Sequence, residues 1–322
     1  MKNRTILWVF LAFILGFALP VCSCVGTGLI TLGTLNRMAG EPASTRIGLG
    51  DAVAVIHLDG AITSGPEEYF STAGITPRRV ADLLEQAANP AVKAIVVRVN
   101  SPGGSVVASD EIYHALLEFE KPVVIWMGEV AASGGYYISC GGDHVFAHPD
   151  TLTGSIGVIS QFLNVEELLD EVGVDVVVIT SGPRKDIGSP YREMTEEEQA
   201  LWREITDEIY EGFVEVVAQA RDLPLDEVRE LADGRIYTGR QALERGLVDD
   251  VGTLDDAVAK AAELGGIEAE PRVIELRPTL GGPWAALLDL LYGLQSRSAM
   301  PTLEEIVGWA GVPSLQFRFV RP

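Results

Sequence analysis

Apolar runs and helix-like patterns alternate along residues 51–265 and predict an α/β fold. Short continuous apolar runs are typical of buried strands, whereas apolar positions three and four apart indicate helices. The expected strands are residues 52–62, 92–99, 122–127, 144–148 and 174–180. The expected helices are residues 76–88, 107–119, a helix starting at Ser133, 165–171, a long helix starting at Thr195, and 254–264. Because strand–helix–strand units form right-handed crossovers, this alternation predicts a parallel sheet.

The long helix has the clearest local signals. Thr195 and Glu198 are spaced as a capping box, which marks a helix start. Apolar residues then recur at helical spacing, at Leu201, Ile205, Ile209, Phe213, Val216, Val217 and Ala220. We expect this stripe to pack against the core.

Residues 1–25 predict a membrane anchor. Lys2 and Arg4 precede residues 6–24, which are almost wholly apolar. About 20 apolar residues can span a bilayer, and basic residues favour the cytoplasmic side. We therefore expect a single-pass transmembrane helix in the cell membrane, with the N-terminus cytoplasmic and the rest extracytoplasmic. A cleaved signal peptide and a lipidated Cys22 or Cys24 remain alternatives.

The remaining chain divides at composition changes. Residues 26–50, rich in Gly, Thr and Ser, are predicted to be a linker, and residues 51–265 the folded domain. Residues 266–322 form a C-terminal extension. Within it, the apolar segment Trp284–Leu294 contains Asp289 and is too short to cross a bilayer. It is expected to be an amphipathic helix.

Composition excludes several classes of function. The net charge of −22, from 46 acidic and 24 basic residues, argues against nucleic acid as a partner. Three cysteines without a CxxC motif, and four histidines without an HExxH motif, indicate neither a disulfide framework nor a metal site. We expect no cofactor.

The segment 128–137, GEVAASGGYY, carries the candidate nucleophile. Ser133 lies between Ala132 and Gly134 at the start of a predicted helix, where small neighbours and free N–H groups surround its hydroxyl. This arrangement suits a serine that forms and stabilises an oxyanion. The alternative is a tight turn in which only small side chains fit.

A second glycine-rich loop, residues 100–104, follows another predicted strand. In a parallel sheet both loops leave carboxyl ends of strands, where α/β folds place their sites. The N–H groups of Gly104 and Gly134 would then form an oxyanion hole.

The sequence offers two kinds of general base. His144 or His148, beside Asp143 or Asp150, could complete a Ser-His-Asp triad.

Lys185 is the other candidate base. It lies in a loop after the predicted buried strand 174–180, and the chain has only five lysines (Lys2, Lys93, Lys121, Lys185 and Lys260). A lysine serves as a base when desolvation lowers its pKa. An ordinary surface lysine is the alternative.

Five ordered motifs, at residues 99–105, 128–137, 153–158, 181–190 and 232–252, together resemble the signal peptide peptidase A family. This resemblance implies a membrane-anchored serine–lysine peptidase with a ClpP/crotonase-like repeated β-β-α superhelix. It implies Ser133 as nucleophile, Lys185 as general base, and Gly104 and Gly134 as the oxyanion hole. Ser155 would orient the lysine.

A single copy of these motifs resembles the short form of the family. That form implies a homo-oligomer in which one protomer's lysine serves its neighbour's serine. The implied substrates are remnant signal peptides and other hydrophobic or unfolded polypeptides. The alternatives are a ClpP-like Ser-His-Asp peptidase, a crotonase-type acyl-CoA enzyme and a catalytically inactive membrane scaffold of the same fold.

Overall fold

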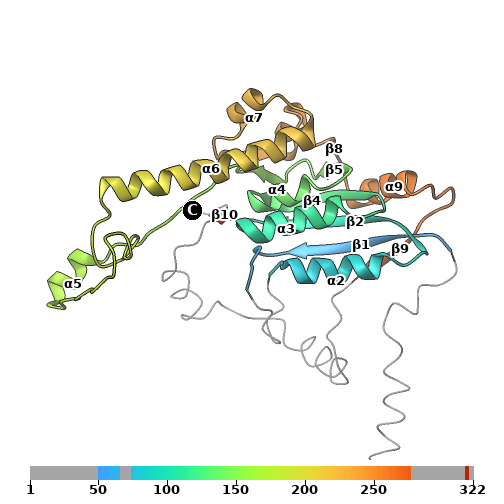
Figure 1. The fold of residues 1–322 in the computed structure, drawn as a ribbon. Helices are drawn as coiled ribbons and strands as arrows, with labels where there is room; N and C mark the ends of the chain where they lie inside the picture. The colour runs from blue at the N-terminus through green and yellow to red at the C-terminus, as the bar shows by residue number, and fades with distance from the viewer. Residues whose placement is uncertain (1–49, 66–73, 277–315, 319–322) are drawn as a thin grey trace, which may run out of the picture. The chain divides into compact units, whose positions relative to one another are not determined.

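The computed structural model describes residues 50–65, 74–276 and 316–318 (Figure 1). The predicted anchor at residues 1–25, nearly all of the predicted linker, and the predicted helix Trp284–Leu294 lie outside these ranges. Within the ranges, no helix is both long and apolar enough to cross a membrane.

The main sheet is mostly parallel, as the alternating pattern predicts. Its strands are β1 (Ala52–Asp59), β2 (Val92–Ser101), β4 (Val123–Ala132), β5 (His144–Ala147), β6 (Leu152–Gly154), β7 (Ile236–Thr238), β8 (Asp250–Val251) and β9 (Arg272–Leu276). The order is β7-β6-β4-β2-β1-β9, and β5 joins β4 to β8. Only β7 runs antiparallel to its neighbour in the described part of this sheet. Through β9 the sheet extends beyond residue 265.

Strand β4 is longer than its apolar run suggests, and this length positions Ser133. Its first half, Val124–Met127, pairs with β5, and its last residues, Val130–Ala132, pair with β6. The chain therefore stays extended up to the residue before Ser133.

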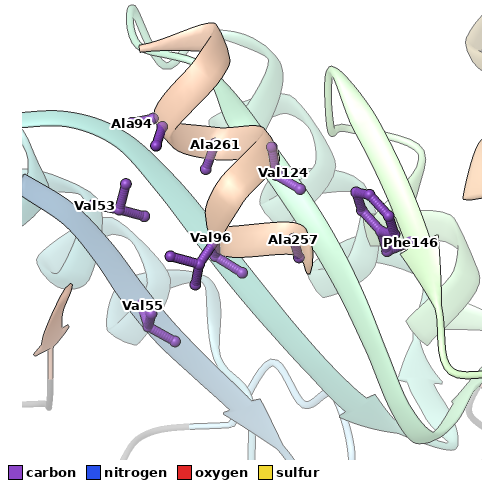
Figure 2. Packing of buried hydrophobic residues seen from close by; sticks show 10 residues of the cluster. Val53, Val55, Ala94, Val96, Val124, Phe146, Ala257 and Ala261 are labelled. Carbon is purple, nitrogen blue, oxygen red and sulfur yellow. The ribbon is translucent and has the colours of Figure 1, made fainter. Parts of the chain in front are cut away.

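Helix α9 (Leu254–Leu264) covers one face of the sheet (Figure 2). Because side chains alternate across a strand, Val53 and Val55 of β1, Val96 of β2 and Val124 of β4 share this face. They pack with the alanine-rich side of α9 in a buried cluster.

Helices α2 (Pro77–Ala87), α3 (Val106–Leu117) and α4 (Gly134–Ser139) lie on the other face (Figure 1). The side chain of Thr76 caps α2, and Pro77 occupies its first turn, where the missing N–H is tolerated. Ser105 caps α3 in the same way. These caps fix where each helix leaves its loop.

A small second sheet lies beside α4. It consists of β3 (Gly103–Ser105) and β10 (Gln316–Arg318), which pair antiparallel, with Phe317 opposite Gly104. Ile62 forms a bridge to the other side of Gly104. The predicted loop 100–104 is thus partly β-structure.

Residues 159–197, here called the exposed segment, contain α5 (Glu166–Val172) and no buried residue. The predicted buried strand at 174–180 is wrong for the single chain, because these residues are neither extended in a sheet nor buried. Val177 and Ile179 are 84% and 92% exposed. Their apolar run has no partner strand within the described part of this chain, so the strand that the local pattern predicts does not form.

Helix α6 (Glu196–Arg221) begins with the predicted capping box. Its apolar stripe is buried only in the second half, at Phe213 and Val217, whereas Leu201 is exposed. The prediction of core packing along the whole stripe is therefore wrong for its first half. The second half packs on α4 and α7 (Leu225–Leu231), and α8 (Gly239–Glu244) follows β7.

Candidate active site

Ser133 occupies a strained turn between β4 and α4. Its backbone has φ 54° and ψ −118°, a conformation that residues with a Cβ atom rarely adopt. Two hydrogen bonds hold it there: the Ser133 N–H donates to the Gly154 carbonyl (2.8 Å), and the Tyr137 N–H donates to the Ser133 carbonyl (2.9 Å). Such strain persists only where the surroundings enforce it, and it clusters at functional sites.

The Ser133 hydroxyl is buried and unpartnered. The residue is 1% exposed, and its Oγ has no hydrogen-bond partner within the described residues. Most buried polar atoms are hydrogen-bonded, so an exception requires a specific explanation. A hydroxyl held ready for a reacting partner provides one.

Gly134 brings the serine turn against the glycine loop of β3. A Cβ atom at Gly134 would lie 3.2 Å from the backbone nitrogen of Gly104 and 2.6 Å from the Ser109 hydroxyl. The residues that carry the two predicted oxyanion amides are therefore in direct contact. Only glycine permits this approach, which explains the small residues after Ser133.

Gly104 is equally constrained on its other side. A Cβ atom there would lie 1.9 Å from the carbonyl oxygen of Ile62. Ile62 accepts a hydrogen bond from the Ser105 N–H (2.8 Å) and donates one to the Gly103 carbonyl (2.9 Å). The loop is thus fixed on both sides of Gly104, so its backbone is preorganised.

Ser155 lies one residue beyond the carbonyl that binds the Ser133 N–H. It has a positive φ of 50°, and its own N–H donates to the Arg235 carbonyl (2.8 Å). The pairing of Ala132 with Gly154 places both serine turns at the same end of β4 and β6. The structure therefore brings Ser133, Gly104, Gly134 and the turn of Ser155 together.

Lys185 is not brought to Ser133 within one chain. It is exposed, in the loop 181–190 of the exposed segment, and its side chain makes no hydrogen bond or ion pair among the described residues. The expectation that a buried strand leads into this loop is wrong, as described above for residues 174–180. A Ser133–Lys185 contact remains a prediction.

Neither candidate histidine contacts Ser133. His144 Nε2 lies 3.1 Å from Asp250 Oδ2, and His148 Nδ1 accepts a hydrogen bond from the Asp150 N–H (3.2 Å). Both rings are therefore engaged elsewhere in the described structure, and neither completes a triad.

Two further serines support the site and were not predicted from the sequence. Ser101 Oγ accepts a hydrogen bond from the Gly103 N–H (3.1 Å), and Ser109 Oγ donates to the Ser105 carbonyl (2.8 Å). Both residues are fully buried. The sequence signal was present in SPGGSVVAS, where serines recur around the glycines.

The fold and this site define a class of protein with a ClpP-like α/β architecture. The family model "Clp protease" matches residues 71–153, which contain the glycine loop and Ser133. The family model "Peptidase family S49" matches residues 115–268, which contain Ser133, Ser155 and Lys185.

Relatives agree with this assignment. A Synechocystis protein described as a protease, slr0021, is 45% identical over 226 residues, which cover 70% of this chain and 77% of the relative. An Enterococcus faecium protein described as signal peptide peptidase SppA is 38% identical, and the match covers 72% of this chain and 67% of the relative. Protease 4 of Salmonella typhi is 39% identical, but the match covers only 39% of that longer chain. The chain belongs to peptidase family S49.

Proposed function

We propose that the chain is a membrane-anchored serine endopeptidase that uses a Ser133–Lys185 dyad. The observation that carries this proposal is the buried, unpartnered Ser133 hydroxyl, held in a strained turn against the glycine loop. Its substrates would be remnant signal peptides and other hydrophobic or unfolded polypeptides. The name of the Enterococcus faecium relative supports this substrate class.

The proposed mechanism proceeds through an acyl-enzyme. Neutral Lys185 accepts the Ser133 proton as Oγ attacks the peptide carbonyl carbon. The N–H groups of Gly104 and Gly134 hold the resulting oxyanion. The lysine gives its proton to the leaving amine, and the C–N bond breaks. The lysine then takes a proton from water as the water oxygen attacks the ester carbonyl carbon, and it returns this proton to Ser133 Oγ as the ester C–O bond breaks. Ser155 orients the lysine amine.

The pairing between β10 and β3 supports a peptide substrate. It shows that an extended backbone can pair antiparallel with Gly103–Ser105, directly beside the predicted oxyanion amides. A substrate in the same place would gain main-chain hydrogen bonds independent of its side chains. The site could therefore bind polypeptides of varied sequence.

A site shared between protomers is part of the proposal. Ser133 Oγ has no hydrogen-bond partner in the described part of the chain, and Lys185 is exposed there, so a second copy could supply a partner for each. The apolar run beside the lysine loop, including Val177 and Ile179, is also exposed. Burial of this run against a neighbour would desolvate the lysine and stabilise a homo-oligomer.

The membrane anchor at residues 1–25 rests on the sequence and remains a proposal. With the N-terminus cytoplasmic, the peptidase domain would lie on the extracytoplasmic side of the cell membrane, next to remnant signal peptides left in that membrane. The domain division at residues 26–50, 51–265 and 266–322 is proposed on the same grounds.

Hydrolysis of a fluorogenic hydrophobic peptide by Ser133→Ala and Lys185→Ala variants tests the dyad. We expect both variants to lose activity while keeping their oligomeric state, and His144→Ala to keep its activity. Co-expressed Ser133→Ala and Lys185→Ala chains should regain partial activity if the site is shared. Wild-type protein without turnover would instead support the inactive scaffold, and an active Lys185→Ala variant would exclude the dyad.

A further inference from the structure

Arg192 is the centre of an ion-pair cluster at the base of the Lys185 loop. Its Nε and Nη2 donate to the two Asp186 carboxylate oxygens (2.8 and 3.0 Å). Its Nη2 and Nη1 donate to the two Glu198 oxygens (2.6 and 2.8 Å). Nη1 also donates to the Glu193 carbonyl (3.1 Å). The guanidinium therefore binds two carboxylates at once, each through two hydrogen bonds.

The cluster connects a loop to a rigid element. Asp186 directly follows Lys185, and its carbonyl accepts the Ser189 N–H (3.0 Å). Glu198 is in the first turn of α6, and its carboxylate also accepts the Thr195 N–H (3.0 Å) in the capping box. The Lys185 loop is thus attached to the start of a 26-residue helix.

The two carboxylate side chains of the cluster are shielded from solvent, whereas the Arg192 side chain is 31% exposed. The side chains of Asp186 and Glu198 are 20% and 6% exposed. Glu198 is buried although nearly all the residues around it are not. By contrast, Arg184 of the same loop pairs with Glu197 at the start of α6, and these side chains are 60% and 76% exposed. Exposed pairs contribute little to stability, whereas bidentate, shielded pairs fix geometry.

We propose that Arg192 is a positioning residue that fixes the backbone of Lys185 by clamping Asp186 to Glu198. This inference rests on the proposed role of Lys185 as general base. A base must reach within about 3 Å of the proton it removes. The loop has no pairing strand in the described chain, and the lysine side chain is flexible, so the clamp supplies the order that a strand would otherwise provide.

Steady-state kinetics of Arg192→Gln, with Arg184→Gln as the matched control, test the proposal. A misplacement of about 1 Å can cost about 100-fold in rate. We therefore expect Arg192→Gln to lower kcat by about 10- to 100-fold with little change in KM. Arg184→Gln should stay within about twofold of wild type. Arg192→Lys should fall between them, because lysine keeps the charge but lacks the planar fork.

A double-mutant cycle separates positioning from general stability. In a Lys185→Ala background, Arg192→Gln should not lower the residual activity further. Asp186→Asn, which leaves the capping box intact, provides a second variant if Arg192→Gln does not fold, and should also lower kcat. Wild-type kcat in both Arg192→Gln and Asp186→Asn would overturn the proposal while leaving the dyad intact. Full activity in Lys185→Ala would instead overturn the proposed function.

Co-expression assigns Arg192 to one half of a shared site. Arg192→Gln chains paired with Ser133→Ala chains should regain activity, because the second chain carries an intact Lys185 loop. Arg192→Gln chains paired with Lys185→Ala chains should not. Recovery in the second pairing would mean that Arg192 does not act through Lys185, and would overturn the proposal.

Discussion

The backbone N–H of Ser133 donates a 2.8 Å hydrogen bond to the carbonyl oxygen of Gly154. This bond joins two turns with positive φ values, that of Ser133 and that of Ser155. Each turn ends a strand of the same parallel pair. The conformation of the nucleophile therefore depends on the segment that carries the predicted lysine-orienting serine.

Replacing Ser133 should show the energetic cost of its turn. A strained backbone conformation costs about 1–3 kcal/mol, and glycine relieves it. Glycine also lowers the free energy of unfolding by about 0.4–1 kcal/mol, because it increases the conformational entropy of the unfolded chain. We therefore expect Ser133→Gly to have a higher free energy of unfolding than Ser133→Ala, by about 1 kcal/mol. Urea denaturation of both inactive variants measures this difference. Equal stabilities would limit the strain in the turn to about 0.4–1 kcal/mol, the stability that glycine loses through the unfolded chain.

Gly134→Ala should damage the site more than the fold. The added Cβ would lie 2.6 Å from Ser109 Oγ and 3.2 Å from the Gly104 nitrogen. Displacing one oxyanion donor typically costs about 100-fold or more in kcat. We expect a loss of this size in peptide hydrolysis.

The double variant Gly134→Ala/Ser109→Ala provides the control for this loss. Removing the Ser109 hydroxyl relieves the shortest contact, so melting temperature should partly recover. The contact with the Gly104 backbone remains, so kcat should stay low. Full recovery of kcat would show that the amides are not displaced.

Much of the sheet was predictable because its strands are buried on both faces. The apolar runs at residues 92–99 and 122–127 correspond to β2 and β4, and residues 254–264 correspond to α9. The end of β4 was not predictable, because Gly128 and Glu129 interrupt the apolar run of residues 122–127. Its extended form depends on pairing with β6, a contact that no local pattern encodes.

The site was predictable only in part. Small residues around Ser133 indicated a tight turn, but its positive φ and its contact with Gly104 depend on tertiary packing. The apolar run 174–180 has the composition of a buried strand and is nevertheless exposed. Pattern reasoning assumes that an apolar run finds its partner within the same chain. The surroundings of Lys185 therefore could not be predicted from its own sequence.

Acid should weaken the start of α6. The Arg192 guanidinium, followed by the Thr195 N–H, lowers the pKa of Glu198 from its ordinary 4.5 to about 2. A lowered folded-state pKa stabilises the fold above the unfolded value, and this contribution is lost as pH falls from about 4.5 to about 2. Wild-type melting temperature should therefore exceed that of Glu198→Gln at pH 7, and the difference should vanish near pH 2. Glu197→Gln, with an exposed carboxylate, is the control. A constant difference down to pH 2 would contradict the clamp.

Arg221 should contribute far more to stability than Arg229 on α7. Arg221 binds Asp249 through two hydrogen bonds (2.7 and 3.0 Å) and is only 10% exposed. Breaking a buried pair leaves an unpaired charge and costs about 3–5 kcal/mol. Asp249 is 31% exposed, so water can partly solvate its unpaired charge. We therefore expect urea denaturation to show that Arg221→Met lowers the free energy of unfolding by about 2–4 kcal/mol. Arg229→Met, whose pair with Glu211 is exposed, should lose less than about 1 kcal/mol. Equal losses would mean that the Arg221 pair is effectively solvated.

Removing residues 316–322 should improve binding of extended substrates. β10 pairs antiparallel with Gly103–Ser105, the edge where we propose that a substrate backbone binds. A strand tethered in the same chain competes at a high effective concentration. A chain ending at Leu315 should therefore show a several-fold lower KM for a hydrophobic peptide, with kcat and melting temperature nearly unchanged. Full-length Phe317→Pro, which removes one backbone N–H from the pairing strand, should shift KM in the same direction. A loss of kcat in both variants would show instead that β10 completes the site, so that substrate must bind elsewhere.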